Sequence, residues 1–207
     1  MANFFYVNNM HSIKVGCLMR TKEKLKLLNS MTPEVLLDNF EMGEQIPIDI
    51  VGLIQKLDIK IIPYDFSNME KSEQYFKDVV TKGSILGAAV ANEENIGIFY
   101  KNDDKINRIR FTLAHELAHC CLHMTPENFE SHIDFRKNEI ATDGTEYEAN
   151  IFAGKLLMPE NAVKYAQKNL LAPYLSSLAK IFGVSEAVMK ARLDYLKLDY
   201  LDTKEGN

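Results

Sequence analysis

The chain has 207 residues, 46% hydrophobic and 26% charged, which suits one globular domain with or without an appendage. Its net charge of −5 argues against a general electrostatic attraction for nucleic acid. The three cysteines Cys17, Cys120 and Cys121 are interpreted as reduced thiols, which favours a cytoplasmic protein. No apolar run is long enough for a signal peptide or a transmembrane helix, so secretion and membrane insertion are not expected.

The first 45 residues are predicted to form a helical extension. Residues 1–18 are predicted to form a short irregular or strand-like lead, to which we assign no function. Residues 20–29 predict a basic amphipathic helix, and Thr32-Pro33 predicts the start of another, with Thr32 as N-cap. We expect this extension to pack on the rest of the chain, and dimerisation or contact with a partner are the alternatives.

The next segments predict a helix followed by a small sheet. Residues 46–57 read as a helix, residues 59–63 as a strand, and residues 65–82 as a polar segment of ambiguous structure. Residues 85–91 and 96–100 predict two strands of a hairpin. The apolar stripe of the helix consists of Ile50, Leu53, Ile54 and Leu57.

The stretch RIRFTLAHELAHCCLH, residues 108–123, contains an HExxH motif formed by His115, Glu116 and His119. Residues four apart lie on one face of a helix, so both imidazoles can direct a nitrogen at one metal ion. Glu116 follows the first histidine and can reach a water molecule at that ion. Because the surrounding residues are mostly apolar, the helix is predicted to be buried, where polar groups need partners. This arrangement indicates a zinc hydrolase rather than hydrogen-bonded core histidines.

A third protein ligand is required. His123 is excluded because it lies eight residues from His115, about 12 Å along a straight helix. Downstream, Glu146 shares a helical face with Asn150, which is placed to hold a ligating imidazole from behind. Glu148 points about 200° away from Glu146 and is the alternative ligand. The same face carries two small residues, which would let this helix approach the histidine helix: Ala149 and Ala153.

The remaining segments are a long loop and a helical tail. Residues 124–143 are charged and include His132, so we expect a functional loop or lid. Pro159 is expected to end the second metal-bearing helix, and another helix follows to about residue 169. Residues 173–200 read as a helix-turn-helix, in which basic residues outnumber acidic residues by only one. We therefore expect packing on the body rather than contact with DNA or another protein.

Three motifs together resemble the ImmA/IrrE family of zinc metallopeptidases: RFTLAHELAH, E-x-x-A-N-x-F-A and LLMP. The resemblance runs from about Ile46 to the C-terminal helices. It implies that His115, His119 and Glu146 bind Zn²⁺ and that Glu116 is the catalytic carboxylate. Ala118 replaces a common glycine, which looks harmless. Gly154-Lys155 replaces the usual Ala-Glu, so we expect a weaker helix or an altered outer face there.

These observations predict an α+β fold: a zincin-like metallopeptidase domain over residues 46–207, with a small β-sheet, two metal-bearing helices and a helical C-terminal region. Glu116 would take a proton from water as it attacks a peptide carbonyl. His132, Tyr100 and Tyr165 are unranked candidates for stabilising the oxyanion. Residues 96–100 would be an edge strand that holds extended substrate.

The family resemblance implies a specific substrate, a helix-turn-helix transcriptional repressor whose cleavage induces a phage, a mobile element or a stress response. We expect no direct contact with nucleic acid or a membrane. Two alternatives stay open: a non-catalytic, metal-stabilised protein-binding regulator, and a DNA-binding regulator. An intact Glu116 argues against the first, and the acidic net charge argues against the second.

Overall fold

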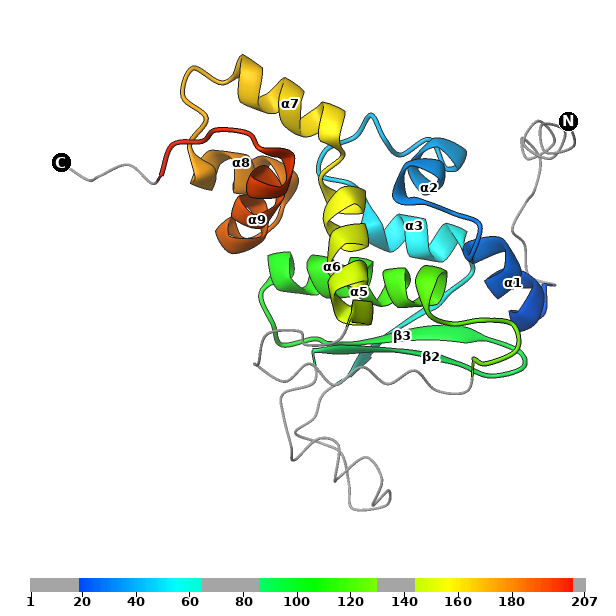
Figure 1. Ribbon diagram of the computed structural model, residues 1–207. Coiled ribbons are helices and arrows are strands. Elements are labelled where there is room, and N and C mark those ends of the chain that lie inside the picture. The colour runs from blue at the N-terminus through cyan, green and yellow to red at the C-terminus, as the bar shows by residue number, and fades with distance from the viewer. Residues whose placement is uncertain (1–18, 65–85, 130–143, 203–207) are drawn as a thin grey trace, which may run out of the picture.

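The computed structural model describes residues 19–64, 86–129 and 144–202. In these residues it has eight helices and one three-stranded sheet, which confirms the predicted α+β class (Figure 1). The predicted lead at residues 1–18, the polar segment at 65–82 and most of the expected loop at 124–143 lie outside the described residues. None of the described helices is both long enough and apolar enough to cross a membrane.

The predicted hairpin is present as β2 (Gly87–Ala91) and β3 (Ile96–Lys101), which pair antiparallel. The side chain of Asn92 closes the turn by accepting hydrogen bonds from the backbone N–H groups of Glu94 and Asn95, at 3.0 and 2.9 Å. An Asn side chain that binds the backbone two residues on is a local turn-forming interaction. The hairpin is therefore encoded close to where it forms.

The expectation that residues 96–100 form an edge strand is wrong. β1 (Lys60–Tyr64) pairs parallel with β3, so the sheet order is β1-β3-β2 and β3 is the central strand. Backbone groups on both sides of β3 are used by its neighbours, which leaves no free edge for substrate. Among the described strands, the outer edges belong to β1 and β2.

Helix α5 (Ile106–Leu122) carries the HExxH motif and lies between the sheet and α6 (Gly144–Leu157), as Figure 1 shows. Every residue from Thr112 to Cys121 is buried. Its partners on the sheet side are β2 and β3, and α6 crosses its opposite side. The predicted burial of this helix is thus correct, and the motif lies in the core of the fold.

Helix α3 (Ile50–Lys56) packs beside α5, and its predicted apolar stripe is buried. The helix begins at Ile50 rather than at residue 46. The carboxylate of Asp49 accepts a hydrogen bond from the N–H of Gly52 at 2.9 Å and caps the helix. A capping side chain fixes the first turn because it satisfies an N–H that has no partner within the helix.

The N-terminal helices α1 (Thr21–Leu28) and α2 (Pro33–Asn39) pack on the rest of the chain. The predicted cap is present, since the Thr32 hydroxyl accepts a hydrogen bond from the N–H of Val35 at 3.3 Å. The Asn29 amide donates to the carbonyls of Cys121 and Met124, at 3.0 and 2.9 Å, and so satisfies acceptors where α5 ends. The apolar side chains of both helices join the main core, including Leu25, Leu28, Leu36 and Leu37, as does Met31 between the helices.

The C-terminal region contains α7 (Glu160–Asn169), α8 (Leu175–Phe182) and α9 (Glu186–Leu196). Gly183 ends α8 in the left-handed region, with φ +63°, and the Ser185 hydroxyl caps α9, as a helix-turn-helix requires. Arg110 of α5 donates to the carbonyl of Gly183 at 3.0 Å, and Arg192 of α9 donates to the carbonyl of Met158 at 3.0 Å. These helices pack on the body, as predicted.

Cys120 and Cys121 are buried free thiols on α5. Burial raises the pKa of Cys121 to about 12 and raises the pKa of Cys120 well above its ordinary value, because a thiolate is poorly solvated in the core. Both therefore behave as small apolar side chains rather than as nucleophiles.

Helix α6 continues through Gly154 to Leu157, so the expected weakness does not interrupt it. A Cβ added at Gly154 would meet only the Met158 Cε within 4 Å, at 3.9 Å. The structure therefore has room for a methyl group at this position, and packing does not require a glycine here.

We predict that Gly154→Ala stabilises the metal-free protein by about 0.5–1 kcal/mol, because alanine loses less backbone entropy in a helix. The measurement is the free energy of unfolding in denaturant. Gly183→Ala is the control and should destabilise by about 1 kcal/mol, since its φ is +63°. A loss of stability in Gly154→Ala would contradict this account of α6.

Candidate metal centre

Helix α5 brings His115 and His119 together one helical turn apart. Their Nε2 atoms lie 2.9 Å from each other, and their ring centroids are 4.7 Å apart. His115 is 0% exposed and His119 is 2% exposed. Two imidazoles in the core direct the same ring nitrogen at one point, as the i, i+4 spacing of HExxH predicts.

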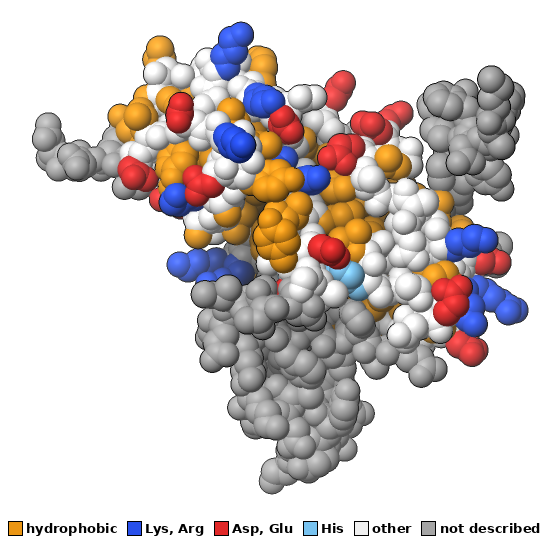
Figure 2. Space-filling model, in the orientation of Figure 1, with side chains coloured by type: hydrophobic (Ala, Val, Ile, Leu, Met, Phe, Trp, Pro, Cys, Tyr) orange, Lys and Arg blue, Asp and Glu red, His pale blue; other side chains and the backbone are white. Residues whose placement is uncertain are grey.

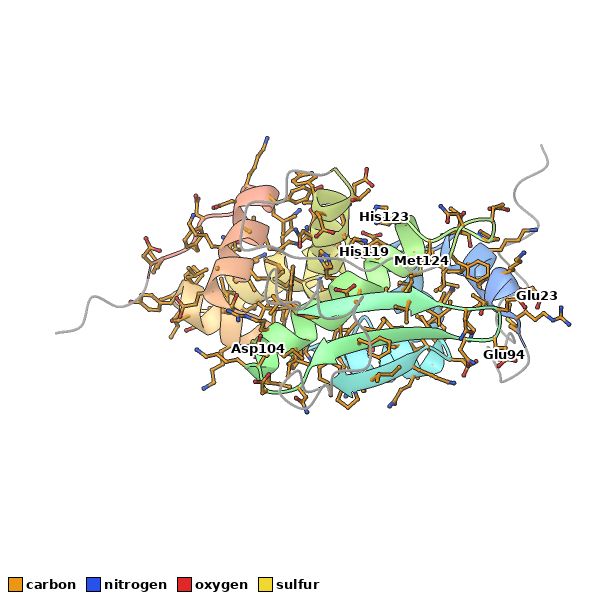
Figure 3. The ribbon with its side chains drawn as sticks, turned by 90° about the horizontal axis from the view of Figure 1, so that it is seen from below. Glu23, Glu94, Asp104, His119, His123 and Met124 are labelled. Carbon is orange, nitrogen blue, oxygen red and sulfur yellow. The ribbon has the colours of Figure 1, made fainter. Side chains whose placement is uncertain are left out.

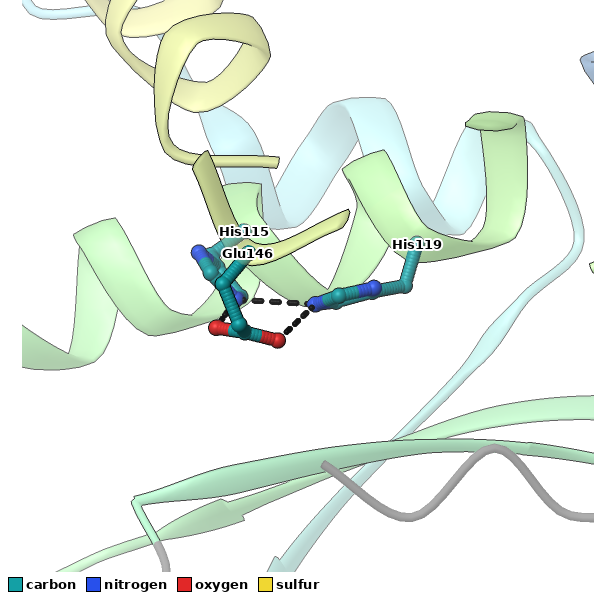
Figure 4. Close-up of side chains that lie close together, drawn as sticks. All are labelled: His115, His119 and Glu146. Carbon is teal, nitrogen blue, oxygen red and sulfur yellow. Dashed lines mark hydrogen bonds and ion pairs between the residues drawn. The ribbon is translucent and has the colours of Figure 1, made fainter. Parts of the chain in front are cut away.

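Glu146 approaches from the first turn of α6 and completes a group of three (Figure 4). One carboxylate oxygen lies 3.3 Å from His115 Nε2, and the other lies 3.2 Å from His119 Nε2. Two alanines of α6 that face α5, Ala149 and Ala153, are fully buried, which allows the close approach of the two helices. The structure brings Glu146 to His115 and His119 and places Glu148 beside His123 instead.

The donor set fits a metal ion. Two imidazole nitrogens and a carboxylate are the ligands of many catalytic zinc sites, and one position is left for water or substrate. Ligand atoms about 2 Å from a tetrahedral ion lie about 3.3 Å apart. The separations of 2.9, 3.2 and 3.3 Å between the three donor groups are close to that value. Among the described residues, His115, His119 and Glu146 are the group that can hold a metal.

Both histidines have a polar contact at Nδ1, the ring nitrogen that does not face Glu146. His115 Nδ1 lies 2.9 Å from Asn150 Oδ1, the contact that the helical spacing of Glu146 and Asn150 predicts. His119 Nδ1 lies 2.9 Å from His123 Nδ1, and His123 Nε2 lies 3.1 Å from the carboxylate of Glu148. The sequence did not predict this second set of contacts. The sequence feature that pointed to the first of these contacts is the spacing of four residues between His119 and His123, which places both on the same face of the helix.

Glu116 is fully buried and lies against β2. A Cβ added at Gly87 would lie 2.8 Å from Glu116 Oε1, 3.0 Å from its Cγ and 2.5 Å from the Thr112 methyl. Glycine at this point of β2 leaves the space that the Glu116 side chain occupies. Sequence reasoning missed Gly87, although a glycine within a strand often marks such a close approach.

The three candidates for oxyanion stabilisation differ in position. His132 lies outside the described residues. Tyr165 is 72% exposed on α7, which follows the C-terminal end of α6, whereas Glu146 lies at its start. About 20 Å of helix separates those ends, so the structure does not bring Tyr165 to the centre. Tyr100 lies opposite Gly87 in the β2–β3 ladder, and paired residues share a face, so it is the better placed of the two tyrosines.

A groove of about 550 Å³ lies between α6 and α9, beside the centre. Hydrophobic side chains gather over these helices (Figure 2). Asn150 and Phe111 line the groove, and the Phe111 ring centroid is 6.4 Å from that of His115. Tyr147 and Tyr195 also line it and are 61% and 48% exposed. The groove is therefore a mostly apolar surface that borders the candidate metal centre at Asn150, the residue that contacts His115.

The family model described as the IrrE N-terminal-like domain, Peptidase_M78, matches residues 54–194. The chain belongs to this family. The match covers the sheet, α5, α6 and nearly all of the C-terminal helices, and confirms the resemblance carried by the sequence motifs. The chain therefore has a metallopeptidase-type domain, and two histidines and a glutamate in it form a group that could hold a metal ion. No curated protein matches the chain significantly.

We predict that Glu146→Ala loses metal more readily than Glu148→Ala. The first change removes a predicted ligand, whereas the second removes a contact to His123. Loss of a group in direct contact with a ligating imidazole weakens metal binding by about 10–100-fold. Loss of Glu148, which reaches His119 only through His123, should cost less than this, and loss of the ligand should cost more. Elemental analysis after dialysis against a chelator is the measurement. The reverse order would make Glu148 the ligand.

Proposed function

We propose that this chain is a zinc-dependent endopeptidase. The observation that carries the proposal is the convergence of His115, His119 and Glu146, with Glu116 next to the first histidine on the same buried helix. Zn²⁺ bound there would supply a Lewis acid for the scissile carbonyl and would lower the pKa of its water towards 7. Imidazole and carboxylate donors in a four-coordinate site favour zinc over magnesium or calcium.

The roles of the protein residues follow from their positions. Glu116 is the general base: it accepts a proton from the attacking water and passes it to the leaving amine. The Asn150 amide and the His123 ring hold the two ligating imidazoles in orientation through Nδ1. Tyr100 is our preferred donor to the oxyanion, because it lies opposite Gly87 on the face of the sheet next to Glu116.

A purely structural metal site is the competing hypothesis. Structural zinc sites use four protein ligands, whereas the described residues supply three. A structural site also does not need Glu116, a carboxylate next to the first ligand that does not itself bind the metal. Burying Glu116 in the core costs free energy. A catalytic base explains why this cost is retained, whereas a metal centre that only stabilises the fold does not.

The substrate that we propose is a helix-turn-helix repressor, cleaved in the cytoplasm to induce a phage, a mobile element or a stress response. Membership of the IrrE-like family supports this choice, and the free buried thiols are consistent with a reducing compartment. The apolar groove between α6 and α9 would suit large apolar side chains of the bound protein. If extended substrate pairs with the sheet, β2 is the strand that does so, since β3 is central.

We propose that the helix-turn-helix of this chain makes no direct contact with nucleic acid. Arg192, one of its few basic residues, is only 6% exposed and donates to the carbonyl of Met158. Lys190 contacts Asp194 at 2.9 Å and the Tyr200 hydroxyl at 2.6 Å. Two of the four basic residues of residues 173–200 are thus already engaged within the chain, so few phosphate contacts can form.

Glu116→Gln should abolish cleavage while leaving the zinc content unchanged, because glutamine is similar in shape but cannot accept the proton. The measurement is mass spectrometry of fragments after incubation with the helix-turn-helix repressor encoded beside this chain. Cutting at the wild-type rate would show that the mechanism is wrong. Casein is the control substrate. If casein is degraded as readily as the repressor, the proposed repressor specificity is wrong and the chain is a general peptidase.

Gly87→Ala should reduce kcat by about 100-fold with zinc retained, because a displacement near 1 Å in an active site has about this effect. The added Cβ would lie 2.8 Å from Glu116 Oε1 and 2.5 Å from the Thr112 methyl, so that both side chains would have to move. Gly97→Ala on β3 is the matched control, because its Cβ would meet the flexible end of Ile62 at 3.3 Å instead. Equal kcat in both variants would show that Gly87 does not position Glu116.

A further inference from the structure

A chain of two contacts runs from His119 to the surface, on the side away from Glu146. His119 Nδ1 and His123 Nδ1 are 2.9 Å apart, and His123 Nε2 and Glu148 Oε2 are 3.1 Å apart. His119 and His123 lie near each other where α5 ends (Figure 3). The side chain of His123 is 8% exposed and that of Glu148 is 65% exposed. The chain therefore begins in the core and ends in solvent.

These contacts determine where the ring protons lie when a metal is bound. His119 directs Nε2 at the metal-binding group, so that nitrogen must carry a lone pair and Nδ1 must carry the proton. His119 Nδ1–H then donates to His123 Nδ1, which has to be the acceptor. The proton of neutral His123 is consequently on Nε2, where it donates to the carboxylate of Glu148. One arrangement satisfies both contacts.

The two ligating histidines are thus supported by different groups. His115 Nδ1 donates to the neutral amide oxygen of Asn150, whereas His119 donates to an imidazole that is itself bound to a carboxylate. A ring whose N–H is drawn towards a negative charge is a more basic ligand at its other nitrogen. The same partners hold the plane of the His119 ring, because rotation about its bond to Cβ would break the contact with His123.

We propose that His123 and Glu148 are positioning residues of the metal centre, which hold His119 in its Nδ1–H tautomer and strengthen its binding of Zn²⁺. This inference rests on the proposed zinc function. His123 contributes more than Glu148, since its contact with His119 is buried while the carboxylate is largely hydrated. Helix α6 then supports the centre twice, through Glu146 as a ligand and through Glu148 two residues later.

The test is the dissociation constant for Zn²⁺ of the full chain, measured by competition with a chromophoric chelator. His123→Phe, which fills the space but accepts no hydrogen bond, should bind Zn²⁺ about 10–100-fold more weakly. Glu148→Gln should show a smaller loss in the same direction. Glu160→Gln is the matched control, because it removes a surface ion pair with Lys164 on α7, and its affinity should equal that of the wild type.

His123→Asn separates the two contacts, since the Asn Oδ1 lies one bond from Cγ, as His Nδ1 does. It should accept from His119 and recover most of the affinity lost in His123→Phe, and adding Glu148→Gln should then change nothing further. A merely structural role for His123 would not give this recovery. Proton–nitrogen NMR of the zinc-loaded protein reads the tautomer directly and should show the proton of His123 on Nε2.

The outcomes separate the two proposals. A wild-type chain that binds no Zn²⁺ would overturn the proposed function and this inference with it. Wild-type affinity in a folded His123→Phe, or a proton on His123 Nδ1 in the zinc-loaded protein, would overturn only the positioning role. If His123→Phe does not fold, the NMR tautomer still decides, because it is measured in the zinc-loaded wild-type protein, where the contact with His119 is in place.

Discussion

The structure depends on the burial of two imidazoles and a carboxylate on one helix. His115, Glu116 and His119 are almost wholly removed from water, although polar groups lose hydration free energy in a core. Glu146 and Asn150 of α6 and His123 at the end of α5 contact the two imidazoles, while the sheet, α3 and α1 pack around the helix. The packing of α6 on α5 therefore both buries the motif and brings Glu146 to the two histidines.

Helix α6 illustrates how one short element can serve several purposes. Ala149 and Ala153 keep its inner face small, so that the first turn reaches the histidines of α5. Glu146 contributes the carboxylate and Asn150, one turn on, supports His115. Because residues four apart project in the same direction, both functions need only a single helical register. A rotation of α6 by one residue would remove both contacts at once.

The ends of α5 are fixed by segments that lie far away in sequence. Asn29 satisfies carbonyls where the helix ends, and Arg110 near its start donates to the carbonyls of Ile48 and Gly183. Such contacts restrict rotation and sliding of the helix, which would otherwise change the separation of the two imidazoles from Glu146. The terminal helices thus contribute to the geometry of the centre without touching it.

The sequence by itself determined what depends on local spacing. The pairing of His115 with His119, the shared face of Glu146 and Asn150, the hairpin turn at Asn92 and the caps at Thr32 and Ser185 all follow from periodicity or from contacts a few residues apart. Tertiary structure alone decided what depends on distant pairing. β1 pairs with the second side of β3, and Gly87 leaves room for Glu116. Glu148 of α6 contacts His123 at the end of α5. Helical periodicity gives the direction of a side chain, but only the packing of separate elements determines which group it meets.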